Sequence, residues 1–299
     1  MDIRTLTYFL EIAKVQNITK AAENLHMSQP PLSRQMQLLE EELGVQLLIR
    51  GKRKVTLTQE GVFLRERAEQ LITFTNKTIE QISSIGNRVT GKIYIGSIES
   101  ISVGIMPKWI TTFHEKYPEV LYDWWSGNSN EVLEKLGKGL IDIAVVRTPC
   151  NNEKFYTISL FKEPWMLYLN KDSDLAKEKG ITISLDRLRD VPIIIPSIKT
   201  RSKQIREWFH KRDMEPKICC EISPAMNAIS LVEEKMGAAI LPESALRATV
   251  GKNIVMKQIV NPTMESEIII AYNRGEQLSV AAEKFVEFVC DAMKEKGTN

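Results

Sequence analysis

The sequence predicts an α/β protein of three parts: an amino-terminal group of short helices, one long helix, and two lobes in which strands alternate with helices. Three observations favour this fold class. Residues 1–58 contain short helical repeats of apolar residues and end in a basic turn. Residues 59–90 contain no proline and keep a helical pattern. Residues 91–299 alternate short apolar runs with amphipathic stretches, which is typical of α/β folds.

The composition excludes several classes of protein. The hydrophobic content of 43% is enough for a folded core, and no run of about 18 apolar residues is present, so we expect no membrane partner. The first residues, MDIRTLTYFLEIAKVQ, mix charged and apolar side chains and predict an amphipathic helix, not a signal peptide. Four cysteines, two of them adjacent at Cys219 and Cys220, make no disulfide framework. We therefore expect a reduced, cytoplasmic protein.

Three helices are expected in residues 1–58. Apolar residues that recur every three or four positions predict the buried stripe of the first helix: Ile3, Leu6, Phe9, Leu10 and Ala13. Thr19 is a plausible N-cap for a short second helix, residues 20–26. Because proline is tolerated only in the first turn of a helix, Pro30 predicts that the third helix begins near it. Gly44 should end that helix.

The third helix has an apolar and a polar face. The apolar face is expected to hold Leu32, Met36, Leu39 and Leu43. The polar face carries Ser33, Arg34, Gln35 and Gln37. Arginine can donate two hydrogen bonds to guanine, and glutamine can pair with adenine, in the major groove of DNA. Two short helices, a tight turn and such a helix predict a helix-turn-helix, with an ordinary solvated face as the alternative.

A basic turn follows the third helix, between two short apolar runs. Residues 1–58 carry eight basic and six acidic side chains, and therefore the whole net charge of +2. Half of these basic side chains gather in the turn: Arg50, Lys52, Arg53 and Lys54. Such a turn is typical of the hairpin in a winged helix-turn-helix, where it contacts phosphates beside the groove. Double-stranded DNA is therefore the expected partner.

One long linker helix is expected over residues 59–90. Residues that recur on average every 3.5 positions form a seam along one side of this helix: Leu64, Ala68, Leu71, Thr75, Ile79, Ile82 and Ile85. Thirty residues make a rod of roughly 45 Å, which is too long for the small amino-terminal part, residues 1–58 (the headpiece), to cover the whole seam. We expect a second copy of the chain to cover it, in a homodimer or homotetramer. Packing against the chain's own carboxy-terminal lobes is the alternative.

The remaining residues are expected to form two Rossmann-like lobes, because strands that alternate with helices favour βαβ units and a parallel sheet. The first lobe is assigned residues 91–161 and 267–299, and the second residues 162–266. Ligands of such sheets bind at the carboxyl ends of the strands. The candidate ligand-binding residues at these ends are Ser97, Ser100, Ser129, Arg147, Ser197 and Thr200.

These side chains suit a small carboxylate or another anion. Hydroxyl groups and helix N-termini donate hydrogen bonds to anions, and Arg147, Lys199 or Arg201 would add positive charge. Two plainer alternatives stay open. Ser100 and Ser129 could be only N-caps, and the three basic side chains could be only solvated surface groups.

Catalysis has little support in the sequence. The histidines at positions 26, 114 and 210 stand alone, and no H-E-x-x-H, G-x-S-x-G or Walker motif occurs. We expect no catalytic residue, no metal site and no cofactor, which disfavours an enzyme. A pure solute-binding protein is disfavoured by the headpiece and the missing export signal. A redox sensor that uses Cys150 or Cys219 remains an alternative, although cysteines on a strand, such as Cys219 and Cys220, are more often inert core residues.

The stretch SQPPLSRQMQLLEEELGVQLLIRGKRKVTLTQEG resembles the signature of LysR-type transcriptional regulators. In that family S-Q-P-x-L-S-R-x-I opens the recognition helix, and L-F-x-R followed by L-T-x-x-G comes after it. The resemblance extends over nearly the whole chain, with Leu48-Ile49 as a departure from the usual Leu-Phe. With the residue types above, it implies DNA contacts from Thr19, Gln29, Pro30, Ser33, Arg34, Gln37, Arg50, Lys52 and Arg53.

The resemblance also implies a two-lobed, periplasmic-binding-protein-like effector domain. It places Ser100 and Ser129 where hydroxyl groups of this family often contact the effector. The expected function is that of a cytoplasmic, sequence-specific regulator of transcription whose DNA binding responds to a small molecule. The effector must then bind one arrangement of the dimer or tetramer better than another.

Overall fold

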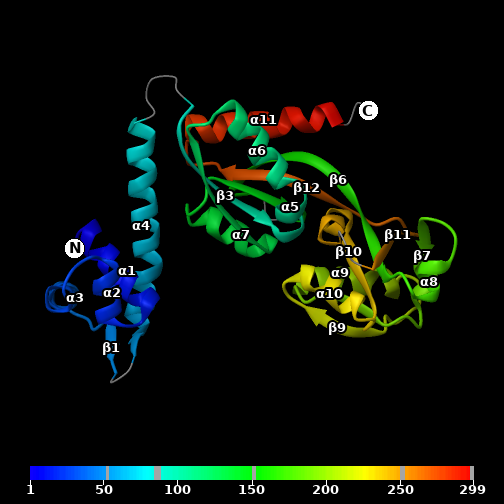
Figure 1. Cartoon of the computed structure of the whole chain (residues 1–299), viewed down its shortest axis with the longest axis horizontal. Helices are drawn as coiled ribbons and strands as arrows, with labels where there is room; N and C mark the ends of the chain where they lie inside the picture. Colours follow the sequence, from blue (N-terminus) through cyan, green and yellow to red (C-terminus); the bar gives the residue numbers. More distant parts are fainter. Residues whose placement is uncertain (52–53, 84–88, 150–152, 250–252, 297–299) are drawn as a thin grey trace. The chain divides into compact units, whose positions relative to one another are not determined.

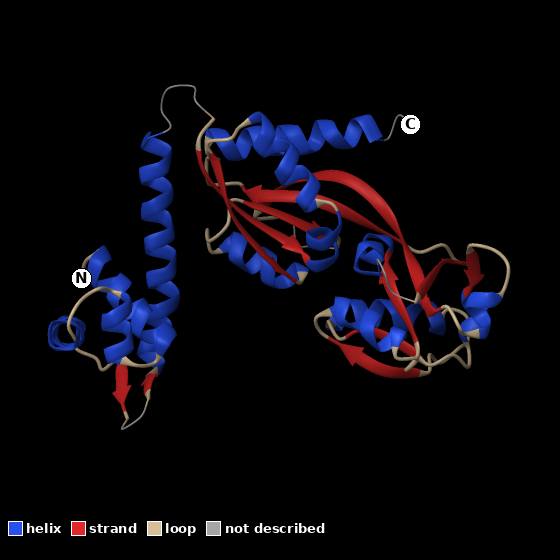
Figure 2. Ribbon diagram, in the orientation of Figure 1, coloured by secondary structure: helices blue, strands red, loops and turns tan. Residues whose placement is uncertain are grey.

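The computed structural model describes residues 1–51, 54–83, 89–149, 153–249 and 253–296. The chain divides into two compact units, Met1–Ile85 with Lys138–Leu140 and Gly86–Gly137 with Ile141–Asn299. The first unit contains the headpiece and the long helix, and the second contains two lobes of strands and helices (Figures 1 and 2).

The headpiece consists of three helices and a short antiparallel hairpin. Its elements and the helix after them are α1 (Ile3–Val15), α2 (Ile18–Asn24), α3 (Gln29–Leu43), β1 (Leu48–Arg50), β2 (Val55–Leu57) and α4 (Gln59–Ser83). Leu48 lies opposite Leu57 in the hairpin. Helix, helix, turn, helix and hairpin follow one another in the order of a winged helix-turn-helix.

Local sequence explains where these helices begin and end. The prediction that Thr19 caps α2 is wrong: the Oδ1 atom of Asn17 accepts a hydrogen bond from the backbone N–H of Lys20 at 3.0 Å. Asn17 precedes the helix, as a cap must, whereas Thr19 is exposed in its first turn. α3 starts with proline in its first turn and ends at Gly44, whose φ of 69° is the left-handed conformation that glycine adopts without steric cost.

One core joins α1, α2, α3 and the start of α4. Its fully buried side chains include Leu6, Phe9, Ile12, Leu32, Met36 and Leu39. Two positions of the predicted stripes are exposed, because they lie at helix ends beyond the edge of this core: Ile3 is 39% exposed and Leu43 is 38% exposed. Leu10 and Ala13 of the first stripe are half-buried.

The long helix α4 differs from the prediction in its first turns. It is 25 residues long, about 38 Å at 1.5 Å per residue. Leu64 and Ala68 are buried in the headpiece core, so the seam does not start with them. The large apolar side chains that α4 exposes after Ala68 are Leu71, Phe74, Ile79 and Ile82. Thr75 is half-buried, and Ile85 lies outside the described residues.

Each lobe of the second unit has its own sheet strands and covering helices (Figure 2). The first lobe contains β3 (Gly91–Ile98), α5 (Glu99–Gly104), α6 (Met106–Lys116), β4 (Val120–Gly127), α7 (Ser129–Gly137), β5 (Ile143–Arg147), β12 (Glu265–Asn273) and α11 (Val280–Lys296). The second contains α8 (Asp174–Lys177), β7 (Thr182–Ser184), η1 (Leu185–Leu188), β8 (Ile193–Pro196), α9 (Lys199–His210), β9 (Ile218–Ile222), η2 (Ala225–Asn227), α10 (Ala228–Glu233), β10 (Ala238–Pro242), η3 (Glu243–Thr249) and β11 (Ile254–Val260).

One long strand, β6 (Phe155–Asn170), was not predicted and belongs to both lobes (Figure 1). Its first half pairs with β12, and its second half pairs with β10 and β11. The strand order is β4-β3-β5-β12-β6-β10-β8-β9. β3 is parallel to β4 and β5, and β8 is parallel to β9 and β10, but β6 and β12 run antiparallel to their neighbours. The predicted parallel pairing is therefore confirmed within each lobe, for β4-β3-β5 and for β10-β8-β9, but it does not extend to β6 and β12. These two strands connect the lobes, so each enters a lobe from the other one.

Aromatic contacts mark the two cores of this unit. In the first lobe Phe113 of α6 meets Phe285 of α11 edge-on, with ring centroids 5.2 Å apart. In the second lobe Trp165 of β6 meets Trp208 of α9 edge-on at 5.4 Å. Among the described residues, no helix has the length and apolar character needed to cross a bilayer.

Candidate DNA interface and ligand cleft

The exposed face of α3 carries the residues that the sequence assigned to DNA. Arg34 and Gln37 are exposed, whereas Met36 between them is buried in the headpiece core. The 3.6-residue period of the helix explains this separation. Ser33 is half-buried, and Gln29 is exposed in the first turn.

The hairpin is attached to α3 through one arginine. Nη1 of Arg50 donates a hydrogen bond to Oγ of Ser33 at 3.1 Å, and Nη2 lies 3.9 Å from Oε2 of Glu40. Oε1 of Glu40 accepts the backbone N–H groups of Leu47 and Leu48 at 2.7 and 3.0 Å. Sequence analysis missed Glu40, which fixes the position of β1 beside the helix.

Two of the other predicted DNA contacts belong to described parts of α2 and α3. Thr19 of α2 and Pro30 of α3 are exposed. Lys52 and Arg53 lie outside the described residues. The backbone N–H of Gly51 donates to the backbone oxygen of Lys54 at 3.0 Å.

A cavity of about 520 Å³, counted with its open mouth, lies between the two lobes of the second unit. Three of the predicted ligand-binding residues, Ser100, Ser129 and Arg147, belong to its wall. The wall also contains charged and aromatic side chains that were not in the predicted set, among them Glu99, Trp165 and Arg201.

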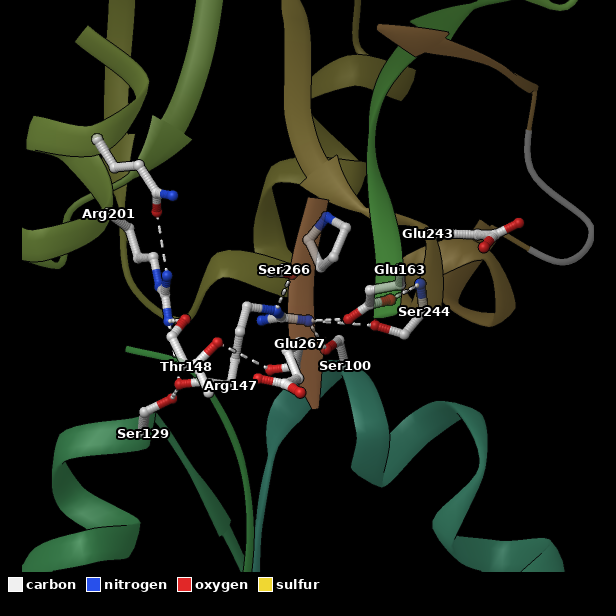
Figure 3. Close-up of polar contacts among 12 residues, drawn as sticks. Ser100, Ser129, Arg147, Thr148, Glu163, Arg201, Glu243, Ser244, Ser266 and Glu267 are labelled. Carbon is white, nitrogen blue, oxygen red and sulfur yellow. Dashed lines mark hydrogen bonds and ion pairs between the residues drawn. The ribbon is translucent and has the colours of Figure 1, made fainter. Parts of the chain in front are cut away.

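Arg147, the last residue of β5, is the centre of a buried polar network (Figure 3). Its Nε donates to Ser266 at 2.9 Å, and its Nη2 donates to Ser100 at 3.2 Å and Ser244 at 3.4 Å. The same Nη2 forms an ion pair with Glu163, whose side chain is only 3% exposed. No described residue accepts a hydrogen bond from Nη1 of Arg147.

Arg201 of α9 joins the second lobe to the end of β5 (Figure 3). Its Nη2 donates to the backbone oxygens of Arg147 at 3.2 Å and Thr148 at 2.7 Å. Arg147 and Arg201 are 8% and 7% exposed, so a solvated surface role is wrong for both. The buried position follows from the two lobes meeting over these side chains. Lys199 is exposed, as a surface lysine would be.

The N-cap alternative is wrong for both serines of the first lobe. Ser100 is the second residue of α5, and Ile98 holds the cap position. Ser129 is the first residue of α7, and its Oγ donates to the backbone oxygen of Arg147 at 3.5 Å. Instead, the backbone N–H groups of Asn130 and Glu131, in the first turn of α7, donate to Oδ1 of Asn128 at 3.0 and 3.1 Å.

Ser97 does not belong to the cavity wall. Its fully buried Oγ is 2.6 Å from Oγ of Ser102 and accepts the indole N–H of Trp124 at 2.7 Å. Ser97 was expected just after the first strand of this lobe, but β3 continues to Ile98, so Ser97 lies within the strand. Ser197 is half-buried and Thr200 is exposed, and neither belongs to the cavity wall. That part of the wall consists of Pro196, Ile198 and Arg201.

Glu99 is an acidic group in the wall that sequence analysis missed. Burial raises the pKa of its carboxyl group, and the negative charge of Glu131 raises it further. Hydrogen bonds from the backbone of Met226 and Ala225, in the second lobe, lower the pKa and so offset part of this rise.

The described cysteines give no support to a reactive thiolate. Cys150 lies outside the described residues. Cys219 is exposed and Cys220 is half-buried, because β9 is the edge strand of the sheet. The expectation that Cys219 is an inert core residue is therefore wrong. Desolvation still raises the pKa of the Cys219 thiol, the opposite of what a redox-sensing cysteine needs. In the described part of the chain no cluster of three His, Cys, Asp or Glu could hold a metal ion.

Comparison with known proteins agrees with this architecture. The family model for bacterial regulatory helix-turn-helix proteins of the lysR family matches residues 3–62, and the LysR substrate binding domain matches residues 86–294. The chain is 31% identical to the HTH-type transcriptional regulator BsdA of Bacillus subtilis, over 96% of this chain and 99% of that protein. It is 29% identical to HcaR, the Hca operon transcriptional activator of Escherichia coli, over 97% of each chain.

Solved structures show the same fold over the full length. CbnR, a LysR family transcriptional regulator, superposes with a TM-score of 0.80 at 23% identity, covering 98% of this chain and 99% of that one. Full-length BenM gives a TM-score of 0.60 at 28% identity, covering 99% and 98%. The chain therefore belongs to the LysR family of transcriptional regulators, with an amino-terminal helix-turn-helix for DNA and a two-lobed carboxy-terminal domain for an effector.

Proposed function

We propose that this regulator reads its DNA site with the exposed face of α3 and contacts phosphates with the hairpin. Arg34 and Gln37 are the side chains best placed for base edges. They are three residues apart, so they share the exposed face of α3, opposite the buried Met36. Backbone contacts are assigned to the remaining candidates around them: Thr19, Gln29, Pro30, Ser33, Arg50, Lys52 and Arg53.

We propose further that the effector is a small anion, such as a carboxylate, bound in the cleft between the lobes. The main observation behind this proposal is that Arg147 lines the cavity and its Nη1 donates a hydrogen bond to no described residue. A charge-assisted hydrogen bond to a carboxylate is about twice as strong as a neutral one. Ser100 and Ser129 add hydroxyl groups beside it. Glu99 in the same wall disfavours a second negative charge on the ligand.

A ligand in this position would touch both lobes. Ser129 belongs to the first lobe and Arg201 to the second, and both line the cavity. We propose that the ligand favours one arrangement of the lobes, and through it one arrangement of a homodimer or homotetramer on DNA. The apolar side chains that α4 exposes after Ala68 are the proposed contact between copies.

The proposed mode of action is binding alone, without a catalytic step. Its support is that the related proteins are transcriptional regulators. Because the partner is DNA, the proposed place of action is the cytoplasm, where bacteria keep their chromosome.

A thermal-shift screen of the full chain tests the effector class. Small carboxylates are compared with the matched neutral amides, since a ligand that binds the folded state raises the melting temperature with occupancy. We expect stabilisation by carboxylates only. Ser129→Ala should weaken it, whereas Ser126→Ala, an exposed serine of β4 outside the wall, should not. Equal stabilisation by the amides would contradict an anionic effector. The active compound should then change binding to the DNA beside the protein's own gene, measured by electrophoretic mobility shift.

A further inference from the structure

Trp165 takes part in both the second core and the cleft. It follows Glu163 by two residues on β6, so the two side chains lie on the same face of the strand. The guanidinium carbon of Arg147 lies 5.7 Å from the centre of its ring, and Trp208 packs against its edge. The residue is only 1% exposed, yet it forms part of the cavity wall.

The indole N–H of Trp165 is buried and donates to no described residue. Polar groups buried in folded proteins nearly always have a hydrogen-bond partner, and a group without one requires an explanation. The chain does satisfy the indole of Trp124, whose Nε1 donates to Ser97 at 2.7 Å. A phenylalanine or leucine would fill the same core position as Trp165 without a buried polar atom.

We propose that Trp165 is a specificity-determining residue of the effector site and that its indole N–H donates a hydrogen bond to an oxygen atom of the bound effector. The proposal rests on the cleft function above, because it concerns the same cavity. An indole N–H can only donate, so the group that meets it must be an acceptor, such as a carboxylate, carbonyl or hydroxyl oxygen.

Two donors then converge on one ligand. Nη1 of Arg147 and Nε1 of Trp165 lack a described acceptor, and the guanidinium carbon of Arg147 lies 5.7 Å from the centre of the Trp165 ring. A small acid that presents oxygen atoms to both groups would satisfy them together. An alkylammonium ion or a hydrocarbon of equal size has no acceptor atom, would leave the indole N–H without a partner and would be rejected.

The test uses the full chain with 15N-labelled tryptophan and the variants Trp165→Phe and Trp208→Phe. Trp208 is the matched control, because it packs against Trp165 but lies outside the cavity wall. The probes are sodium acetate, sodium pyruvate and sodium benzoate, each paired with its amide. The indole proton resonance of Trp165, assigned by its loss in Trp165→Phe, and the dissociation constants of the probes are measured.

Any probe that stabilises the chain should move the Trp165 indole proton downfield. Trp165→Phe should weaken that probe about 10- to 100-fold, as expected for the loss of a hydrogen bond to a charged group. Trp208→Phe should change its affinity by no more than about twofold. If Trp165→Phe does not fold, the resonance is assigned by replacing each of the other four tryptophans with phenylalanine, and its shift in the native chain then decides the matter.

Other outcomes separate the two proposals. Carboxylates that stabilise the chain, leave the resonance in place and bind Trp165→Phe equally well would overturn the role of Trp165 but keep the anionic effector. Amides that alone stabilise the chain and shift the resonance would overturn the anionic effector but keep the role of Trp165. A resonance that no probe shifts would overturn the role of Trp165.

Discussion

The substitution Glu163→Gln tests the buried ion pair that joins the two lobes. Glu163 is 3% exposed and pairs with Arg147, itself 8% exposed; its Oε2 also accepts the backbone N–H of Ser244 at 2.8 Å. Glutamine keeps the shape and an acceptor oxygen but removes the negative charge. Because the guanidinium then stays buried without a counter-charge, we expect the second unit to lose about 3–5 kcal/mol of unfolding free energy.

Glu178→Gln is the matched control. It removes the partner of Arg187 from an ion pair whose side chains are 45% and 58% exposed, which should cost about 0–1 kcal/mol. Urea unfolding followed by tryptophan fluorescence reports on the second unit alone, because all five tryptophans belong to it. A double variant, Glu163→Gln with Arg147→Met, should recover part of the loss. Equal stability of Glu163→Gln and Glu178→Gln would refute the reasoning.

Three further predictions concern the headpiece and the cleft. Arg34→Ala should cost about 1–3 kcal/mol of binding to the cognate site and relax sequence preference in a competition assay; an equal loss on random DNA would make Arg34 a phosphate contact. Leu39→Ala, at a position 1% exposed, should destabilise the headpiece by about 2–5 kcal/mol in urea unfolding followed by circular dichroism, while Leu38→Ala, 45% exposed, should change it little; similar effects would contradict the core assignment. Glu99→Gln should raise the melting temperature at pH 7. Burial raises the pKa of Glu99, so its contribution to stability is present below the unfolded value of 4.5 and is lost as the pH rises through the folded pKa. The rise in melting temperature that Glu99→Gln causes should therefore vanish in acid. An unchanged melting temperature at pH 7 would contradict the burial of a charged Glu99.

The headpiece could be predicted from the sequence because its signals are local. Pro30 and Gly44 delimit α3, and the spacing of Leu32, Met36 and Leu39 shows its buried face. The strand β6 could not be found in this way. Its first half is partly exposed and its second half is buried on both faces, so neither the strand period nor the helix period appears along it.

The cleft could be predicted in position but not in its internal contacts. Strand ends identified Ser100, Ser129 and Arg147, which line the cavity. The burial of Arg147 depends on Ser266, 119 residues away along the chain, and on Glu163 of the unrecognised strand. Such partners are not visible in sequence spacing. Ser97 was misplaced because β3 runs further than its apolar alternation indicates.

Groove recognition by α3 is tested most directly by methylation interference on the DNA that the full chain protects. Guanine N7 faces the major groove, and an arginine that donates to N7 and O6 cannot bind a methylated base. We expect one or more guanines whose methylation weakens the native chain but not Arg34→Ala. The same interference pattern for both proteins would mean that Arg34 does not read a guanine, and would contradict the assignment of α3 as the helix that reads the bases.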